Sequence, residues 1–292
     1  MEASDFIVML ARQRSGTNPL RAVVDTHRHL FCTPEVFHDT PSPKAELEVE
    51  TNFFGFLERH PLGTVRRAMS MDHQGTLFID FLEYLRCFTS KRYVLVDVKY
   101  NSAHHLDGPW RELSAQPDLF RFVKRTGVRV LNLTRRNALR SHISLLKANL
   151  TDTWTVETHD DTPIADRPIW VDPVEMLHVL RTSRAEDELI ERSFEDYALY
   201  FAFDYAELFP SLGAPPSAAV LESIARWLGV GPDFGHVEPR YRKQSALPLE
   251  DTILNYDEIV QTLEGTGFED LLQDEPMYRR AGNQRAAGRH LT

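Results

Sequence analysis

Short apolar runs alternate with amphipathic segments along the chain. Residues 6–11 form a continuous apolar run, the pattern of a strand that is buried on both faces. Further strands of this kind are expected at 93–98, 128–133 and 199–203. Apolar side chains at helical spacing predict helices from Pro19 onward and at 75–89, 117–126, 137–149, 173–192, 215–228 and 249–263. Because strands alternate with helices, we expect an α/β fold with a central parallel β-sheet flanked by helices.

The segment 151–168 shows little periodicity and holds two prolines. We expect it to be a long surface loop that covers a substrate. No internal repeat or clear domain break is visible, so residues 1–275 are expected to form a single domain. Residues 276–292 contain four arginines and no apolar pattern, which predicts a flexible basic tail.

Composition narrows the class of protein. The chain has 292 residues, with 33 Lys and Arg against 43 Asp and Glu, so its formal net charge is −10. This acidic balance argues against nucleic acid as a partner. Cys32 and Cys87 are too few for a disulfide scaffold, and we expect reduced thiols in the cytoplasm. No apolar run approaches the ~20 residues of a membrane span.

The polar loop after the first apolar run suits an anion. Arg14-Ser15-Gly16-Thr17-Asn18 lies between an expected strand and an expected helix, whose first amide groups favour a phosphate. Gly16 permits close backbone approach, while the side chains on either side of it add donors and Arg14 adds a positive charge. The Gly-Lys-Ser/Thr ending of a Walker A loop is absent. An ordinary capped turn before a helix has the same composition.

A second cationic segment follows the expected strand at 128–133. Arg135 and Arg136 stand at the strand's end, and Ser144 comes eight residues after Arg136, within the next expected helix. A helix whose first residues are basic and exposed to solvent, with no ligand, would have the same sequence pattern. The two loops nevertheless both follow buried strands, and ligands of open parallel sheets bind at the carboxyl ends of the strands. Together they favour a ligand with two anionic groups.

This pair of motifs resembles the cofactor signature of sulfotransferases that use 3′-phosphoadenosine 5′-phosphosulfate (PAPS). In that family a Lys/Arg-Ser-Gly-Thr/Ser loop holds the 5′-phosphosulfate, which the resemblance assigns to Arg14, Ser15, Gly16, Thr17 and Asn18. An Arg placed eight residues before a Ser holds the 3′-phosphate there. The resemblance therefore gives this second role to Arg136 and Ser144.

Other segments extend the resemblance. Residues 241–244 and 253–258 are similar to the closing segment of bacterial sulfotransferases, where a basic residue, here Arg242 or Lys243, contacts the nucleotide. The resemblance covers most of residues 5–265, although its specific motifs occupy only about 40 residues. It implies a P-loop-like sulfotransferase fold. Two departures stand out, since Asn18-Pro19 replaces the usual second Thr, and the Lys-x-His of eukaryotic members is here Lys99-Tyr100-Asn101.

The resemblance implies sulfuryl transfer from PAPS, as co-substrate, to a hydroxyl or amine of a small-molecule or carbohydrate acceptor. Such in-line displacements depend on positioning and electrostatics. We expect no metal, with Arg14 and Lys99 neutralising charge on the transferred group. A general base must accept the acceptor's proton. Glu35, in a Pro-Glu stretch similar to that of bacterial members, is the first candidate, and His104 and His105 are the next.

Two other classes of function stay open. Asp25-x-His27-x-His29, if it were a strand, would place both histidines on one face, which is similar to the first metal-ligand strand of amidohydrolases. Lys99 and four later histidines would then supply further ligands: His142, His159, His178 and His236. If the segment were helical, His27 and His29 would point about 200° apart and could not share a metal. The third class is a nucleotide-binding protein without catalytic activity.

Overall fold

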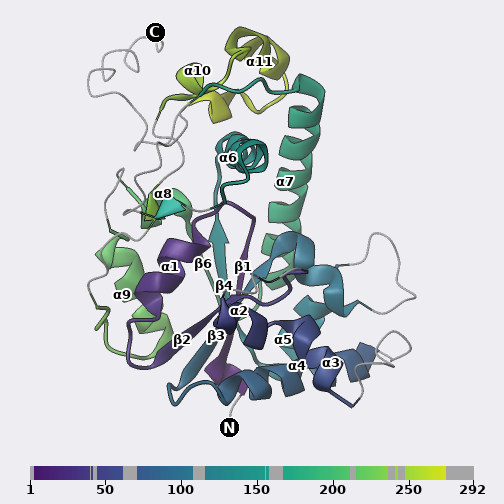
Figure 1. Cartoon of the computed structure of the whole chain (residues 1–292), viewed down its shortest axis with the longest axis vertical. Coiled ribbons are helices and arrows are strands. Elements are labelled where there is room, and N and C mark those ends of the chain that lie inside the picture. Colours follow the sequence, from purple (N-terminus) through teal and green to yellow (C-terminus); the bar gives the residue numbers. More distant parts are fainter. Residues whose placement is uncertain are drawn as a thin grey trace. The chain divides into compact units, whose positions relative to one another are not determined.

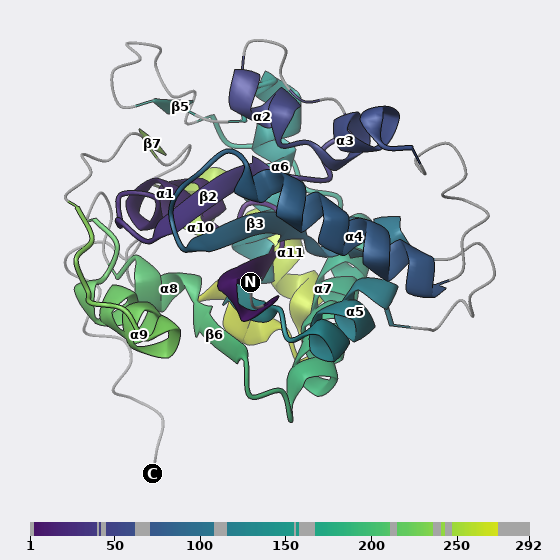
Figure 2. The same cartoon turned by 90° about the horizontal axis from the view of Figure 1, so that it is seen from below.

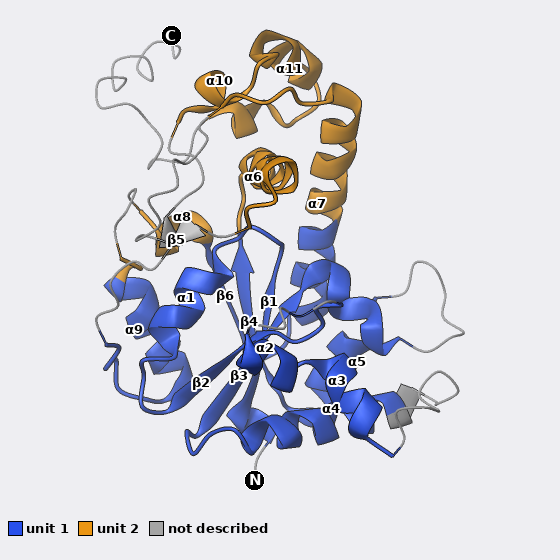
Figure 3. Cartoon of the chain, in the orientation of Figure 1, with its two compact units in different colours: residues 1–134, 186–204, 218–237 blue, residues 135–185, 205–217, 238–292 orange. Residues whose placement is uncertain are grey.

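The computed structural model describes residues 3–39, 41, 45–61, 71–107, 116–154, 156–157, 167–210, 215–235, 241–242 and 247–273. The chain divides into two compact units (Figure 3). Unit 1 comprises residues 1–134, 186–204 and 218–237, and unit 2 comprises residues 135–185, 205–217 and 238–292. The expected single domain over 1–275 stays a prediction, and the expected basic tail lies outside the described residues.

Unit 1 is built on a sheet of five parallel strands, which confirms the expected α/β fold. The strands lie in the order β2-β3-β1-β4-β6. Their bounds are β1 Phe6–Ala11, β2 Leu30–Glu35, β3 Tyr93–Lys99, β4 Arg129–Thr134 and β6 Tyr200–Asp204. The central strand β1 and its neighbour β3 are buried at every position, as continuous apolar runs require in a sheet covered on both faces.

Helices cover both faces of this sheet. Helices α1 (Thr17–Val24) and α9 (Ala218–Leu228) lie on one side of the strands, and α4 (Met71–Arg86) and α5 (Asp118–Thr126) lie on the other (Figures 1 and 2). The core between the sheet and α4 and α5 takes alternate residues of β1 and β3, because successive side chains point to opposite faces. Unit 1 also contains η1 (Ala3–Asp5), α2 (Glu46–Glu50), α3 (Phe53–Arg59) and η3 (Tyr100–Leu106).

Two features of unit 1 differ from expectation. Strand β2 was not expected, because its apolar run is short and ends in Thr33-Pro34-Glu35. The strand tolerates Pro34 because it lies at the edge of the sheet, where one side of the backbone needs no ladder partner. Helix α1 begins at Thr17 rather than at Pro19. Proline is accepted there because the amides of the first turn have no acceptor within the helix.

Unit 2 is mainly helical. Its elements are α6 (Ala138–Thr151), the first part of α7 (Pro173–Phe194), α8 (Tyr205–Leu208), α10 (Leu249–Thr252), α11 (Tyr256–Leu263), η4 (Glu269–Leu272) and an antiparallel pair of β5 (Val156–Glu157) and β7 (Tyr241–Arg242). Its core includes side chains from α6, α7 and α11. None of the helices in the described parts of either unit combines the length and apolar character that a membrane crossing needs.

The expected continuous helix over 249–263 is wrong, because the chain is extended between α10 and α11. Ile253 has φ −111° and ψ 121° and forms a parallel bridge with Ile169. The Asn255 side chain then bonds to both backbone groups of Val171, accepting from its N–H at 3.0 Å and donating to its carbonyl at 2.9 Å. These contacts with a distant segment outweigh the local helical pattern. The expected loop at 151–168 contains β5, and residues 155 and 158–166 lie outside the described parts.

Replacing Asn255 tests this junction. We expect Asn255→Ala to lower the free energy of unfolding by about 2 kcal/mol, because the buried N–H and carbonyl of Val171 lose their partners. Glu258→Ala is the matched control, since it removes a side chain that accepts an exposed hydrogen bond from Asn255. Its effect should stay within about 0.5 kcal/mol in denaturant unfolding. Equal effects of the two changes would contradict this account of the junction.

Candidate functional site

The loop between β1 and α1 has a backbone suited to an anion. Arg14 has φ 65° and Gly16 has φ 80°, so two residues of this short loop are in the left-handed region. Such alternation turns successive backbone N–H groups toward one side and forms a concave anion-binding nest. Gly16 is also the N-cap of α1 and provides no capping side chain. The first amides of α1 therefore have neither an acceptor within the helix nor a side-chain cap.

Ser15 is a second sign of a ligand at this loop. The residue is 1% exposed, and among the described residues its Oγ has no hydrogen-bond partner. A buried hydroxyl left without a partner costs roughly 1–3 kcal/mol. A group that accepts a hydrogen bond from Ser15 would remove this cost. The loop therefore has a buried donor beside the amides of a helix start, which is the arrangement that phosphate or sulfate needs.

Arg12 fixes the start of the loop. It follows β1 directly and pairs with two carboxylates of α7, from Nε to Glu186 at 3.2 Å and from Nη2 to Asp187 at 3.0 Å. Its guanidinium also lies 5.3 Å from the centre of the Tyr100 ring. Burial raises the pKa of Asp187, and the positive charge of Arg12 lowers it in part. The arginine is thus held from two sides, so it serves as an anchor of the loop within unit 1.

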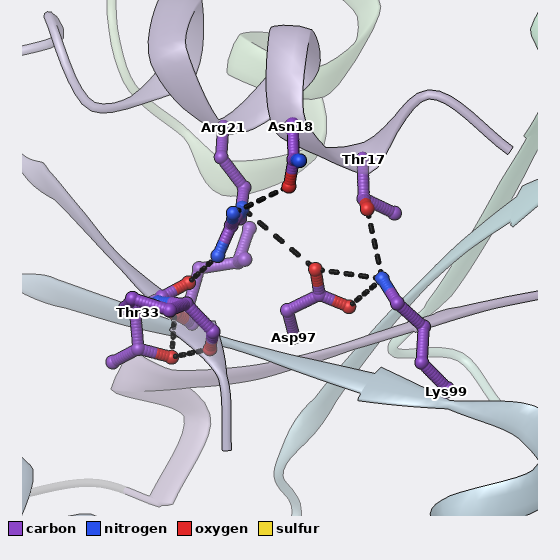
Figure 4. Close-up of polar contacts among 8 residues, drawn as sticks. Thr17, Asn18, Arg21, Thr33, Asp97 and Lys99 are labelled. Atoms are coloured by element: carbon purple, nitrogen blue, oxygen red, sulfur yellow. Dashed lines mark hydrogen bonds and ion pairs between the residues drawn. The ribbon is translucent and has the colours of Figure 1, made fainter. Parts of the chain in front are cut away.

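Lys99 lies at the carboxyl end of β3 and reaches the first residue of α1. Its Nζ donates to Thr17 Oγ1 at 2.8 Å and to both carboxylate oxygens of Asp97, at 2.7 and 2.8 Å (Figure 4). Asp97 is 1% exposed and Lys99 is 6% exposed. A buried carboxylate of this kind needs a positive partner, because isolated charges are costly away from water. The structure thus brings two expected site residues, Lys99 and Thr17, into direct contact.

Arg21 completes the cluster on the other side of Asp97. Figure 4 shows the Asp97 carboxylate between Lys99 and Arg21, whose Nε is 3.7 Å from Oδ2. The guanidinium is held by two further acceptors, the Thr33 carbonyl at 2.8 Å and Asn18 Oδ1 at 2.6 Å. Asn18, whose side chain was expected to donate to a phosphate, thus uses its amide oxygen to support Arg21. The cluster therefore joins α1 to β2 and β3.

Glu35 ends β2 and is the in-register neighbour of Asp97 on β3. Paired residues of adjacent strands project to the same side of the sheet. Burial raises the pKa of Glu35, Lys99 lowers it, and Asp97 raises it, with smaller lowering effects from His38 and Arg21. The carboxyl group thus holds a proton more tightly than an exposed glutamate does. A general base benefits from such a shift toward neutral pH.

The two other candidate bases have partners. His104 is exposed, and its Nδ1 is 2.6 Å from Asp107 Oδ2. His105 packs against aromatic rings, with its ring centre 5.5 Å from that of Phe37 and 5.1 Å from that of Phe54. Both lie in η3, directly after the strand that carries Lys99. The role of each of the three candidates as a base stays a prediction.

The residues expected to bind the 3′-phosphate lie in unit 2. Arg136 is exposed and comes two residues before α6, and Ser144 is half-buried within that helix. Arg135, which precedes Arg136 in the chain, is buried, and its guanidinium lies 4.4 Å from the centre of the Tyr205 ring. Arg242 lies in β7, and Lys243 lies outside the described residues. The roles of Arg136, Ser144, Arg242 and Lys243 in nucleotide binding stay predictions.

His27 and His29, the first ligands of the metal-site alternative, are not on a strand. Residues 25–29 form the turn between α1 and β2. His27 is fully buried, with Nε2 2.9 Å from the Gly231 carbonyl, and its Nδ1 accepts from the His29 amide at 3.2 Å. His27 therefore already uses both ring nitrogens. Across the described ranges no three His, Cys, Asp or Glu side chains gather as a metal site would require, and His159 and His236 lie outside those ranges.

Sequence reasoning did not identify two structural residues of the site. Arg12 and Arg21 were not expected to contribute, yet they hold the loop and Asp97. The spacing of Asn18 and Arg21, three residues apart on one helix, was the available sign of their contact. The pairs of Arg12 span more than 170 residues and left no local sign.

No protein-family model matches the chain, and no curated protein sequence is significantly similar to it.

A double-mutant cycle tests the Asp97–Lys99 pair. We expect Lys99→Met to lower the free energy of unfolding by about 3 kcal/mol, because Arg21, at 3.7 Å, is then the one ion-pair partner of the buried Asp97 carboxylate among the described residues. Asp97→Asn alone should also destabilise the protein. The double variant should lose clearly less than the sum, since neither the buried carboxylate nor the buried ammonium group is left without the other. Additive losses in urea unfolding would show that the two side chains do not interact.

Proposed function

We propose that this protein is a sulfotransferase that moves a sulfuryl group from PAPS to a hydroxyl or amine of a small-molecule or carbohydrate acceptor. The observation that carries the proposal is the β1–α1 loop. There the Gly16 N-cap provides no capping side chain, the buried Ser15 hydroxyl has no hydrogen-bond partner among the described residues, and Thr17 contacts Lys99. The resemblance of Arg14–Asn18 to the sulfotransferase loop supplies the identity of the anion. The general chemistry of the loop fits phosphate and sulfate alike.

Different groups of the loop and of β3 would bind different parts of the co-substrate. Backbone amides at Gly16 and Thr17 and the Ser15 hydroxyl would hold the 5′-phosphate, and Arg14 adds a positive charge. Lys99 would neutralise charge on the oxygen that leaves sulfur. All three of its N–H bonds are now directed at Asp97 and Thr17, so it must exchange one of these partners for the ligand. The bound co-substrate supplies a sulfuryl group already activated by a phosphate leaving group.

Glu35 would accept the proton of the acceptor. During transfer an acceptor oxygen or nitrogen forms a bond to sulfur, the bond from sulfur to the phosphate oxygen breaks, and 3′,5′-bisphosphoadenosine leaves with the electron pair. The acceptor's proton passes to the Glu35 carboxylate. The raised pKa of Glu35 supports this role, because it makes the carboxylate a stronger base.

Nucleotide binding tests the proposed function directly. We expect 3′,5′-bisphosphoadenosine to bind in calorimetry, and Arg14→Asn to weaken that binding at least about tenfold, the effect of one charge-assisted contact. Asparagine is chosen because it tolerates the left-handed conformation that residue 14 adopts. Arg136→Ala should remove the preference for this nucleotide over adenosine 5′-phosphate. If the purified protein binds neither nucleotide and adds no sulfuryl mass to any acceptor supplied with PAPS, the proposal fails.

Glu35→Gln separates the base from the binding groups. We expect turnover to fall at least about 100-fold, the usual contribution of a general base, with nucleotide affinity nearly unchanged. Wild-type turnover should decline as pH falls through the raised pKa of Glu35, because only the ionised form accepts a proton. At pH 7 the variant should be at least as stable as the wild type, since burial disfavours the charged carboxylate. Full activity of Glu35→Gln would remove Glu35 from the mechanism.

A further inference from the structure

The charges around Asp97 are balanced in a way that binding of an anion must disturb. Asp97 and Glu35 carry two negative charges when ionised, and Lys99 and Arg21 carry two positive charges. Lys99 uses one N–H for Thr17 and the others for Asp97. An anion at the β1–α1 loop that takes a hydrogen bond from Lys99 therefore weakens the hold of the ammonium group on Asp97.

Arg21 is poorly placed to replace the lost contact. Its Nε is 3.7 Å from Asp97 and has no hydrogen-bond partner among the described residues. Its two terminal nitrogens are bonded to the Thr33 carbonyl and to Asn18. Moving the guanidinium toward Asp97 would break those bonds. Since Asp97 is almost wholly buried, water does not screen its charge either.

Glu35 is the titratable group that must respond. It is paired in register with Asp97 across two neighbouring strands, which lie roughly 4.8 Å apart in parallel sheets. The groups that act on its pKa are Lys99 and Asp97 of β3, Arg21 of α1, and His38 beyond the end of its own strand. Of these, Asp97 raises the pKa and Lys99 opposes it. Drawing Lys99 toward an anion therefore favours the protonated form of Glu35.

We propose that Asp97 is a positioning residue that couples occupancy of the β1–α1 loop to proton uptake by Glu35, acting through the shared ammonium group of Lys99. The role of this coupling in catalysis rests on the proposed function, because during sulfuryl transfer the proton that Glu35 takes up comes from the acceptor. Glu35 becomes a better proton acceptor once the sulfuryl donor is in place. In the absence of an acceptor the proton comes from solvent, and no covalent bond to carbon, phosphorus or sulfur changes.

Inorganic sulfate is the probe for this coupling. Sulfate does not titrate between about pH 5 and 8, so any proton taken up on binding goes to the protein. The whole protein is titrated with sulfate by calorimetry in two buffers of different ionisation enthalpy, at an ionic strength held constant with chloride. The difference in heat between the buffers gives the number of protons bound per anion. We expect wild-type protein to take up a fraction of a proton, with a maximum near the raised pKa of Glu35.

Three variants test whether the proton taken up on sulfate binding goes to Glu35 and whether its uptake depends on Asp97. Uptake should disappear in Glu35→Gln and fall to less than about half in Asp97→Asn, while Asp97→Glu, which keeps the charge, should retain it. Circular dichroism and denaturant unfolding identify any variant that does not fold. The wild-type measurement stands on its own, because binding of sulfate without proton uptake overturns the proposal whatever the variants do. Undiminished uptake in a folded Asp97→Asn overturns it as well, since direct repulsion by the anion would then suffice.

The outcomes separate this coupling from the identity of the nucleotide. If 3′,5′-bisphosphoadenosine does not bind but sulfate binds with proton uptake that depends on Asp97, the coupling stands and the sulfotransferase proposal fails. If the nucleotide binds and sulfate binds without proton uptake, the coupling fails and the sulfotransferase proposal stands. If sulfate does not bind at all, the loop is not an anion site for this probe and the coupling is overturned.

Discussion

The buried ion pair of Asp97 and Lys99 is the constraint on which the candidate site depends. Both residues lie on β3, two positions apart, and so project to the face that α1 covers. Charges placed there require polar partners from the covering helix. Thr17 and Arg21 meet this requirement because they are four residues apart and share one side of α1. The pair thus limits how α1 can lie against the sheet, and it brings the β1–α1 loop to the end of β3.

The fold was predictable wherever local pattern and final structure agree. The strand at 93–98 is apolar enough to be recognised alone, and the helix at 117–126 ends where Gly127 adopts φ 77°. Strand β2 was missed because it is a short edge strand containing Pro34, whose stability comes from pairing with β3. The break at Ile253 was missed because a distant bridge with Ile169, not the local sequence, holds it extended.

The candidate site was likewise predictable where it depends on residues close together in the sequence, and not where it depends on distant contacts. The loop Arg14–Asn18 has a composition that indicates an anion site, and the structure adds its left-handed turns and the buried Ser15 hydroxyl. Asp97 lies within the strand that was expected at 93–98 and contacts Lys99 there. Its position opposite Glu35 depends on the register of a strand that the sequence did not reveal. The anchor provided by Arg12 depends on carboxylates more than 170 residues away.

The net charge of −10 makes this local arrangement necessary for any anionic ligand. The field of the whole chain opposes the approach of an anion, so attraction must come from fixed groups within a few ångströms. Backbone amides at a helix start provide such attraction through a fixed partial positive charge, and Arg14 adds a full positive charge. Lys99 differs from them, because Asp97 neutralises it until a ligand competes for its hydrogen bonds. On the proposed function, the backbone amides of the loop would therefore hold the anion first, and the anion would gain a hydrogen bond from Lys99 only by disturbing the balance of charge around Asp97 and Glu35.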